Sequence, residues 1–597
     1  MAVHVPLQSG CPVPRPLITV TDLSFRYPGA STDTLRNVNL TINEGDFVAV
    51  IGGNGSAKTT LCKTFNGLIP HYWNGEFAGA VHVNGVDTWT SSVAELSAHV
   101  GYVYQDFSNQ LVRPTVRDEV SFGPVNYGHD DHEERTTDAL NALGIAELAH
   151  SFVWQLSGGQ AHLTALASVL AQRPQVLIVD EPVAELDPER AAIIYERLAT
   201  LNRELGLTII TIEHHMEFVA RYATSVVLMA QGAPLWHLPI DEAITKTDDL
   251  AAQGIPAPQP IATVQALGLT GTPRTADAAI DMIRDAHLTV DPQWPGIAHL
   301  TDSATTAGSG DTVARAINVT HGYTSVSGTI NPVLRDVSVD IHQGDRIALV
   351  GGNGAGKSTL MRLLAGIIVP REGTVRLGDT NTRSKSAPHH ASYAAYLYQH
   401  PELMLLTGSV ADDVALFPTQ RKHPDTEKLV NRILDRVRLR DVAHRDGRTL
   451  SGGQQRRATL AIGLAMRPTV LLLDEPTSSL DVGSRHDVTH MLTELADSIH
   501  ATVVATHDMQ LVAEWANRVL VLNNGTIIAD CHPRDLFANP DILTRARITP
   551  PDIVTMGAAL GVHPIPLSVS ELYAAFYGTL PTATHPTTPA TTPPQGH

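Results

Sequence analysis

The sequence predicts an α/β fold that occurs twice along one chain of 597 residues, each copy with a helical subdomain and a small C-terminal helical appendix. Three observations predict this fold. Each half has a short apolar run that leads into a glycine-rich loop and then a helical pattern. Each half has a second apolar run that ends in Asp-Glu. Equivalent residues recur at nearly constant spacing, since Lys58 and Lys357 are 299 residues apart and His214 and His507 are 293 apart.

The elements follow the same order in both halves. Residues 47–51 and 347–350 are apolar runs too short for helices, and the helical patterns after the loops begin at Leu61 and Leu360. The second apolar runs cover residues 176–179 and 470–473. Short buried strands that alternate with helical patterns are typical of a mainly parallel sheet covered by helices.

The expected organisation has seven parts. The segment TDSATTAGSGD has the composition of a flexible linker, and the Pro/Thr-rich end of the chain is expected to be disordered. A further repeat, residues 255–268 and 548–561, predicts a helical appendix after each α/β domain. The parts are an N-terminal extension (1–16), a first α/β domain (17–240), its appendix (241–300), the linker (301–311), a second α/β domain (312–537), its appendix (538–579) and a tail (580–597).

Composition excludes several classes of function. Lys and Arg total 42 against 61 Asp and Glu, a net charge of −19, so we expect no nucleic-acid partner. Three cysteines are too few for a disulfide framework and fit a reducing cytosol. The chain has no apolar run of about 18 residues and no signal-peptide pattern at its start, so any membrane role is expected to come through partners.

The glycine-rich loops have the pattern of phosphate-binding loops. The second loop fits G-x-x-x-x-G-K-[ST] fully, whereas the first has Ala57 in place of the last glycine. Backbone N–H groups, the positive end of the following helix and a lysine together bind a phosphate tail, and the next hydroxyl binds Mg²⁺. The predicted contacts are Gly52, Asn54, Gly55, Ala57, Lys58, Thr59 and Thr60 in the first half, and Gly351, Asn353, Gly354, Gly356, Lys357, Ser358 and Thr359 in the second.

The Asp-Glu pairs divide two tasks. Asp180 and Asp474 are expected to hold Mg²⁺ through its water shell, because this ion keeps several waters and takes few protein carboxylates. Glu181 and Glu475 are expected to polarise the attacking water as general bases. The sequence therefore predicts hydrolysis of a nucleoside triphosphate, with ATP and Mg²⁺ as ligands.

A second motif, LSGGQ, occurs at residues 156–160 and 450–454. Together with the loops and the Asp-Glu pairs it makes both halves resemble the ATP-binding cassette (ABC) family, a class of P-loop nucleoside triphosphatases, nearly from end to end. The resemblance implies that each LSGGQ opens a helix that binds the γ-phosphate of ATP held by the opposite domain, so the two domains pair within the chain. The implied ATP contacts are Ser157, Gly158, Gly159 and Gln160, and Ser451, Gly452, Gly453 and Gln454.

The resemblance implies two composite sites. One site pairs the Lys58 loop with Ser451 and Gly453, and the other pairs the Lys357 loop with Ser157 and Gly159. It assigns four further pairs of residues. They are Tyr27 and Tyr323, which stack on adenine or else are ordinary strand-edge tyrosines; Gln105 and Gln399, which sense Mg²⁺ and water beside the membrane partner; His214 and His507, which contact the γ-phosphate; and Asp187 and Asp481, which cross the domain interface.

The halves differ at two places. A residue with a side chain at the position of Ala57 costs about 1 kcal/mol if that position needs a positive φ. After the first LSGGQ the chain continues Ala161-His162-Leu163, whereas the second continues Gln455-Arg456-Arg457. We therefore expect two hydrolytic sites, of which the Lys58 site is slower or weaker.

The segment after Gln105 is more specific. The stretches 105–111, 114–116 and 122–124 resemble the ATPase subunits of energy-coupling factor (ECF) importers, and residues 66–71 are similar to the fused two-domain members. The second half matches less well at residues 399–403. The resemblance implies a peripheral subunit on the cytoplasmic face of the membrane, bound to an integral membrane coupling protein and a substrate-binding membrane protein, that drives uptake of a vitamin or metal ion.

Two alternatives stay open. One is a soluble tandem ABC protein that acts on the ribosome, although such proteins join their cassettes by a long charged helical arm and tend to be basic. Here the net charge is −19 and the joining segment is rich in Ala, Pro and Thr. The other is the fused ATPase of a sugar or peptide importer.

Overall fold

The computed structural model describes residues 15–183, 188–291, 294, 310–324, 328–478, 480, 482–495 and 499–577. These residues form two compact units. The first lies within Met1–Ala257 and Ser478–His486, and the second within Pro258–Thr477 and Asp487–His597. The division at Ala257 falls inside the expected first appendix. Among the described residues, no helix combines the length and the apolar character that crossing a bilayer requires.

The first unit contains a mainly parallel six-stranded sheet in the order β10-β9-β3-β8-β7-β6, with only β10 antiparallel. Its central strands are buried on both faces, which explains their continuous apolar runs. An antiparallel four-stranded sheet, β2-β1-β4-β5, lies in the same unit. The strands are β1 (Pro16–Arg26), β2 (Leu35–Asn43), β3 (Phe47–Ile51), β4 (Glu76–Val83), β5 (Val86–Asp87), β6 (Val100–Val103), β7 (Val176–Asp180), β8 (Thr208–Ile212), β9 (Ser225–Ala230) and β10 (Ala233–Pro239).

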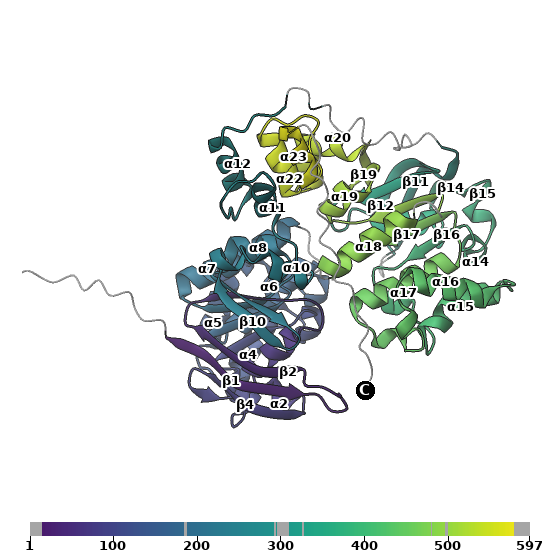
Figure 1. Ribbon diagram of the computed structural model, residues 1–597. Coiled ribbons are helices and arrows are strands. Elements are labelled where there is room, and N and C mark those ends of the chain that lie inside the picture. The colour runs from purple at the N-terminus through teal and green to yellow at the C-terminus, as the bar shows by residue number, and fades with distance from the viewer. Residues whose placement is uncertain are drawn as a thin grey trace, which may run out of the picture. The chain divides into compact units, whose positions relative to one another are not determined.

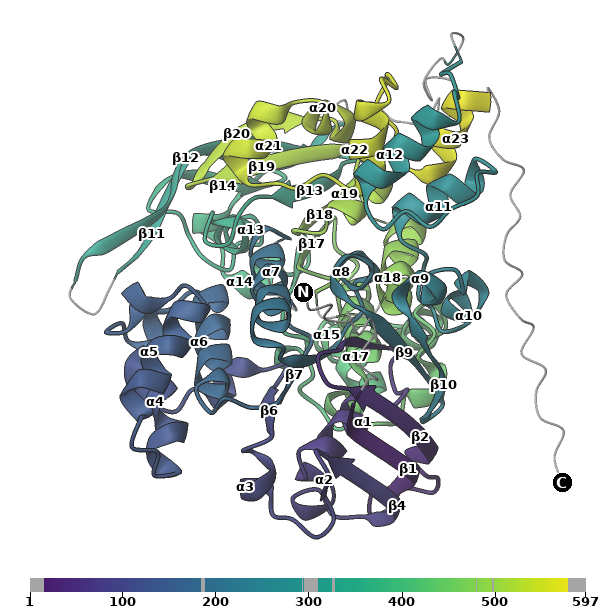
Figure 2. The ribbon, with the colours of Figure 1, turned by 90° about the vertical axis from the view of Figure 1, so that its left-hand side faces the viewer.

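Three helices of the first unit form the helical subdomain. α4, α5 and α6 pack against one another, and Figure 2 shows them gathered beside the strands β6 and β7. The helices are α1 (Lys58–Phe65), α2 (Leu68–His71), α3 (Val93–Leu96), η1 (Phe107–Gln110), α4 (Val116–Asn126), α5 (His132–Ala142), η2 (Ala146–Leu148), η3 (Val153–Gln155), α6 (Gly158–Leu170), α7 (Pro188–Leu205), α8 (Met216–Tyr222), α9 (Ile240–Ala243) and α10 (Thr247–Ala252).

The second unit repeats both sheets, in the orders β16-β17-β18-β13-β19-β20 and β12-β11-β14-β15. The strands are β11 (Thr312–Thr324), β12 (Ile330–His342), β13 (Arg346–Val350), β14 (Glu372–Leu377), β15 (Thr380–Asn381), β16 (Ala394–Leu397), β17 (Val470–Asp474), β18 (Ala501–Ala505), β19 (Arg518–Asn523) and β20 (Thr526–Cys531). The helices between them are α13 (Lys357–Leu364), η5 (Thr382–Ser384), α14 (Ala387–His390), η6 (Pro401–Leu403), α15 (Val410–Gln420), α16 (Thr426–Arg436), η7 (Arg440–Val442), η8 (Gly447–Thr449), α17 (Gly452–Ala465), α18 (Val482–Leu495) and α19 (Met509–Trp515).

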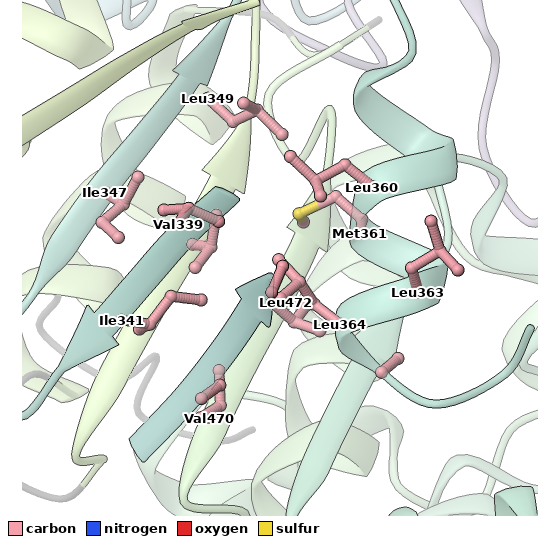
Figure 3. Close-up of a cluster of buried hydrophobic side chains, with 14 of the residues drawn as sticks. Val339, Ile341, Ile347, Leu349, Leu360, Met361, Leu363, Leu364, Val470 and Leu472 are labelled. Atoms are coloured by element: carbon pink, nitrogen blue, oxygen red, sulfur yellow. The ribbon is translucent and has the colours of Figure 1, made fainter. Parts of the chain in front are cut away.

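The core of the second unit fixes the helix that follows its phosphate loop. Figure 3 shows Leu360, Met361 and Leu364 of α13 facing side chains of β12, β13 and β17. Leu360 and Met361 are fully buried. Burial of such side chains contributes about 1.5–3 kcal/mol each, so this face holds α13 firmly against the sheet and sets the direction from which its N-terminus leaves the sheet edge.

The helical appendices pack together inside the second unit. α11 (Gln259–Ala266) and α12 (Ala276–Asp285) lie against α22 (Asp552–Ala559) and α23 (Val569–Tyr577), as Figure 1 shows. Val264, Ile280, Ile553 and Leu572 belong to one buried apolar cluster, so the four helices share a core. α20 (Pro533–Phe537) and α21 (Pro540–Ala546) connect β20 to this bundle. The part of the first appendix that follows Ala257 thus belongs to the second compact unit.

Polar contacts join the appendices as well. The N–H of Ile553 donates to the side chain of Gln259 at 2.9 Å, and the Arg284 guanidinium donates to the carbonyl of Ala559 at 2.9 Å. The N–H of Asp291 donates to the carbonyl of Ala575 at 2.8 Å. Each bond joins residues of different halves of the chain.

The structure confirms the tandem α/β fold and differs from the expectation in two details. The helices after the loops begin at Lys58 and Lys357 rather than at Leu61 and Leu360, because the residue before each lysine takes a left-handed conformation that starts the helix there. The antiparallel sheets were not expected. Their strands alternate buried and exposed residues, a pattern that is weaker than a continuous apolar run.

Candidate functional site

The two phosphate loops have the same backbone form. Gly52 and Gly351 have φ of 149° and 148°. A Cβ atom at Gly52 would lie 2.4 Å from the carbonyl oxygen of Met229, and one at Gly351 would lie 2.1 Å from that of Leu522, so only glycine fits at either place. Each loop connects a central strand of the parallel sheet to a helix N-terminus, which is the context that anion binding requires.

The loop lysines are buried and held over their own loops. The Lys58 ammonium donates to the carbonyls of Gly52 and Gly53 at 2.8 and 3.2 Å. The Lys357 ammonium donates to the carbonyl of Gly351 at 2.7 Å. Both ammonium groups therefore lie over the first residues of their own loops.

The position before each lysine needs a positive φ in both halves. Ala57 has φ 75° and ψ 24°, and Gly356 has φ 108° and ψ 10°. The two surroundings differ, because a Cβ at Gly356 would lie 2.7 Å from Cδ2 of Leu334. The Ala57 methyl instead packs against the core of the first unit. The first half has therefore accommodated a methyl group for which the second half lacks room.

A buried aspartate ends β7 in the first half and β17 in the second half. The Asp180 carboxylate accepts a hydrogen bond from the Tyr102 hydroxyl at 3.0 Å and is within hydrogen-bonding reach of the Thr59 hydroxyl. Burial and then the charge of Glu181 raise the pKa of Asp180 to about 6. In the second half Asp474 accepts from the Tyr396 hydroxyl at 2.6 Å. A hydroxyl beside a carboxylate with crowded negative charge is a donor set that fits a divalent cation.

The glutamates after these aspartates meet the predicted histidines. The Gln105 amide donates to Oε2 of Glu181 at 2.7 Å, and Nε2 of His214 lies 3.1 Å from Oε1 of the same carboxylate. Nδ1 of His507 lies 3.0 Å from Oε2 of Glu475. Glu181 and Glu475 have φ of 52° and 46°. Residues other than glycine rarely adopt a positive φ, and such backbone strain is concentrated at functional sites.

The pKa of His507 is raised above its ordinary value. Burial lowers this pKa, but the charge of Glu475 and a hydrogen bond to it raise the pKa by more. The imidazole therefore stays protonated to a higher pH than a free histidine.

The loops that contain Gln105 and Gln399 are attached to the helices α6 and α17 in different ways. The Arg456 guanidinium, 6% exposed, donates to the carbonyls of Tyr398 and Gln399 at 3.0 and 2.8 Å. The equivalent residue of the first half, His162, stacks on Phe107 at 4.6 Å between ring centroids. Burial lowers the pKa of His162 to about 4, so this histidine is neutral near pH 7. The second loop is thus held by a charge and the first by an aromatic stack.

Both LSGGQ segments begin helices with the same cap. Ser157 caps α6 and Ser451 caps α17, and in each case the serine and the glutamine three residues later form a capping box. The N–H groups of Gly158 and Gly159, and of Gly452 and Gly453, belong to the first turn of these helices. The positive end of each helix is therefore well defined and suited to an anion.

Two other predicted pairs have different outcomes. The hydroxyl of Tyr27 lies 3.4 Å from that of Thr60, and the hydroxyl of Tyr323 lies 3.4 Å from that of Thr359, so both rings stand beside the helix that begins at the loop lysine. Asp187 and Asp481 lie outside the described residues. Within each half, the loop, the Asp-Glu pair and the histidine come together at the carboxyl ends of the parallel strands.

Several residues at the site were not predicted from the sequence. Tyr102 and Tyr396 recur at the same offset as Asp180 and Asp474, so the repeat itself could have revealed them. Glu213, next to His214, has no equivalent in the second half, where Thr506 takes its place. Only the geometry shows that this carboxylate is buried.

The loop, the strand-end aspartate and the neighbouring glutamate and histidine define a P-loop nucleoside triphosphatase. The pattern of the family described as ABC transporter matches residues 35–184 and 334–478. A "Putative ABC transporter ATP-binding protein" of Methanosarcina acetivorans is 33% identical over 590 residues, which cover 94% of this chain and 91% of the relative. A protein of the same name from Methanosarcina mazei is 31% identical, covering 93% and 95%. The chain belongs to the ATP-binding proteins of the ABC transporter family.

One solved structure is similar to a single half. It is cbiO1 from Clostridium perfringens, described as part of the ABC transporter complex cbiONQ, and it is 32% identical, with a TM-score of 0.36. The alignment covers 40% of this chain and 94% of that one. With two ABC domains, this protein binds and hydrolyses ATP.

Proposed function

We propose that the chain is the motor subunit of a membrane importer and that it hydrolyses ATP at two composite sites. The carrying observation is that each half has a complete set consisting of loop lysine, buried aspartate and a glutamate in contact with a histidine. Each LSGGQ segment begins a helix that its serine caps. In this proposal Ser451 completes the Lys58 site and Ser157 completes the Lys357 site.

The residues of each site have distinct tasks. Lys58 and Lys357 bind the outer phosphates, and Tyr27 and Tyr323 stack on adenine. Glu181 and Glu475 take a proton from the attacking water as general bases. His214 and His507 hold the glutamates by the contacts described above and orient the γ-phosphate. Asp187 and Asp481 cross between the domains.

Mg²⁺ fits the donor set at the strand ends. Thr59 and Asp180 would hold it in the first half and Ser358 and Asp474 in the second, with Gln105 and Gln399 facing its waters. When bound, the ion offsets the negative charge of the phosphate oxygens. Tyr102 orients the Asp180 carboxylate for this purpose through its hydrogen bond.

The two sites are expected to differ in rate. Glu181→Gln and Glu475→Gln each remove one general base, and the ATPase rate of each variant measures the site that remains. We expect Glu475→Gln to lower turnover more, because the Lys58 site carries the strained Ala57. If Glu181→Gln abolishes turnover and Glu475→Gln barely matters, the ranking is wrong.

The transport role rests on the segment around Gln105 and on the appendices. Residues 105–111 resemble those of ECF ATPases, and the paired appendices supply a fixed connection between the halves. We therefore infer peripheral attachment at the cytoplasmic face of the membrane, an integral coupling protein, a substrate-binding membrane protein, and a vitamin or metal ion as substrate.

Co-purification tests the transport role. The tagged chain, isolated from detergent-solubilised membranes of its own host, should carry small integral membrane proteins in constant ratio. Sedimentation with ribosomes would overturn the proposal, and co-purification with the membrane subunits of a sugar or peptide importer would replace the substrate class. A control chain with Gly159→Asp should still co-purify, since its defect lies in ATP binding.

A further inference from the structure

A buried carboxylate lies beside His214, the histidine of the first half that is predicted to contact the γ-phosphate. Glu213 follows β8 and is 1% exposed. Its Oε1 accepts from the backbone N–H groups of His214 and His215 at 2.8 and 2.9 Å, and from Nδ1 of His215 at 2.8 Å. Its Oε2 accepts from the Tyr195 hydroxyl. Four donors therefore surround one buried charge, which satisfies it fully.

The second half builds the same turn without such a group. Thr506 stands at the equivalent position, and its hydroxyl accepts a hydrogen bond from the N–H of Asp508 at 3.0 Å. Asp508 caps α19 by accepting from the N–H groups of Gln510 and Leu511, each at 3.1 Å. In the first half His215 stands at the cap of α8 and makes no side-chain capping bond. The turn therefore has its carboxylate before the histidine in the first half and after the histidine in the second half.

Glu213 joins three elements at one point. Tyr195 belongs to α7, the helix that begins at Pro188, downstream of Glu181. Its ring is buried and stacks on Phe218 and Tyr222 of α8, with centroid distances of 4.7 and 5.4 Å. The backbone of the turn between β8 and α8 is therefore connected to α7 and α8 through the Glu213 side chain. A threonine hydroxyl is too short and has too few acceptor sites to do this.

We propose that Glu213 is a positioning residue for the first hydrolytic site. It fixes the backbone on either side of the His214 side chain, so that Nε2 stays within 3.1 Å of Glu181. A shift of about 1 Å in such a contact can cost on the order of a hundredfold in rate. Glu213 acts through His214, because its hydrogen bonds go to the backbone on either side of that side chain, to His215 and to Tyr195. The inference rests on the proposed role of His214.

Steady-state ATP hydrolysis by the full chain carrying Glu475→Gln tests this inference, because the remaining hydrolysis then comes from the Lys58 site. The variants are Glu213→Gln, which keeps the shape but puts an amide N–H₂ among four donors, and His214→Ala, which sets the full effect. We expect Glu213→Gln to lower kcat at least half as far as His214→Ala on a logarithmic scale, with KM for ATP within twofold. Glu213→Asp should recover part of the loss.

A matched control separates positioning from general stability. Glu119 is a second buried carboxylate of the same unit, and it accepts the N–H groups of Val112 and Arg113 at 2.8 and 2.7 Å. Glu119→Gln should lower the unfolding temperature without the split between kcat and KM. Should Glu213→Gln fail to fold, Tyr195→Phe removes one donor of the four and should lower kcat by a smaller factor in the same way.

The results for these variants distinguish failure of the inference from failure of the proposed function. Full loss in His214→Ala together with unchanged kcat in Glu213→Gln and Tyr195→Phe overturns the inference and leaves the proposed function standing. An unchanged kcat in His214→Ala overturns both, because the histidine then has no role for Glu213 to support.

Discussion

At the scale of single residues, the first phosphate loop contains an alanine in a conformation that favours glycine. Ala57 has φ 75°, and the left-handed region costs a residue with a side chain about 1–2 kcal/mol. Its methyl contacts the core of the first unit, which recovers part of that cost. The departure from the loop pattern is therefore a tolerated strain, and the N–H groups of the loop keep their direction.

Exchanging the residues tests this view. Gly356→Ala puts a Cβ 2.7 Å from Leu334 and should lower the free energy of unfolding by about 2 kcal/mol. Ala57→Gly relieves backbone strain in the folded state but raises the conformational entropy of the unfolded chain. It should therefore change the free energy of unfolding by less than about 1 kcal/mol. Chemical denaturation of the two variants measures both values. A larger loss in Ala57→Gly than in Gly356→Ala would contradict the account.

The sequence predicted the residues of the site better than their surroundings. Lys58, Asp180, Glu181 and His214 were identified because short motifs encode them. The positive φ of the glutamates and the fully hydrogen-bonded carboxylate of Glu213 depend on contacts between distant segments, such as Tyr195 with Glu213. No local pattern reports such contacts.

At the scale of elements, the attachment of each glutamine loop to its signature helix differs between the halves. Arg456→His in α17 copies the first half and removes the two bonds to the carbonyls of Tyr398 and Gln399. We expect faster hydrogen exchange in residues 398–404. We also expect the free energy of unfolding to fall by roughly 2 kcal/mol, because hydrogen bonds to a charged group contribute about 1.5–3 kcal/mol. His162→Phe, which keeps the stack on Phe107, is the control and should leave exchange in residues 105–111 unchanged.

The turn between β8 and α8 should make stability depend on pH. Burial alone would raise the pKa of Glu213, but bonds from His215 and other donors lower it to about 2. Burial lowers the pKa of His215, and Glu213 raises it by more, so the net shift is upward. The contribution of His215 is full below its unfolded pKa of about 6.5 and is lost as pH rises through the folded pKa. That of Glu213 is present above about 4.3 and is lost as pH falls towards 2.

The window of full contribution therefore lies between about pH 4.3 and 6.5. We expect His215→Phe to lower the free energy of unfolding more at pH 6 than at pH 9, measured against the parent chain at each pH. Equal losses at the two values would show that His215 acts through packing alone.

At the scale of the whole molecule, the appendices connect the halves. α11 and α12 come from the first half but share a core with α22 and α23. Val264→Asp would bury a charge at a fully buried position and should cost on the order of 3 kcal/mol or more. Hydrogen exchange should then rise in α22 and α23 as well as in α11. Exchange confined to α11 would show that the four helices do not form one cooperative bundle.

The repeat predicted two α/β domains with appendices, but not the division of the chain into units. The repeat of residues 255–268 at 548–561 predicts a helical appendix and gives no information about which surface it packs on. The bond between Gln259 and Ile553 joins residues 294 apart, and pairing over such a separation has no local signal.

One motor with two composite sites requires that each site use the signature helix of the other half. In a chain carrying Glu475→Gln, the remaining ATP hydrolysis comes from the Lys58 site. Ser451 caps α17. If that helix completes the Lys58 site from the other half, as proposed, adding Ser451→Arg should abolish the remaining hydrolysis. Adding Ser157→Arg should lower it by no more than about twofold, a small loss of transition-state stabilisation of about 0.4 kcal/mol. The reverse result, loss with Ser157→Arg and little change with Ser451→Arg, would show that each half works with its own signature helix.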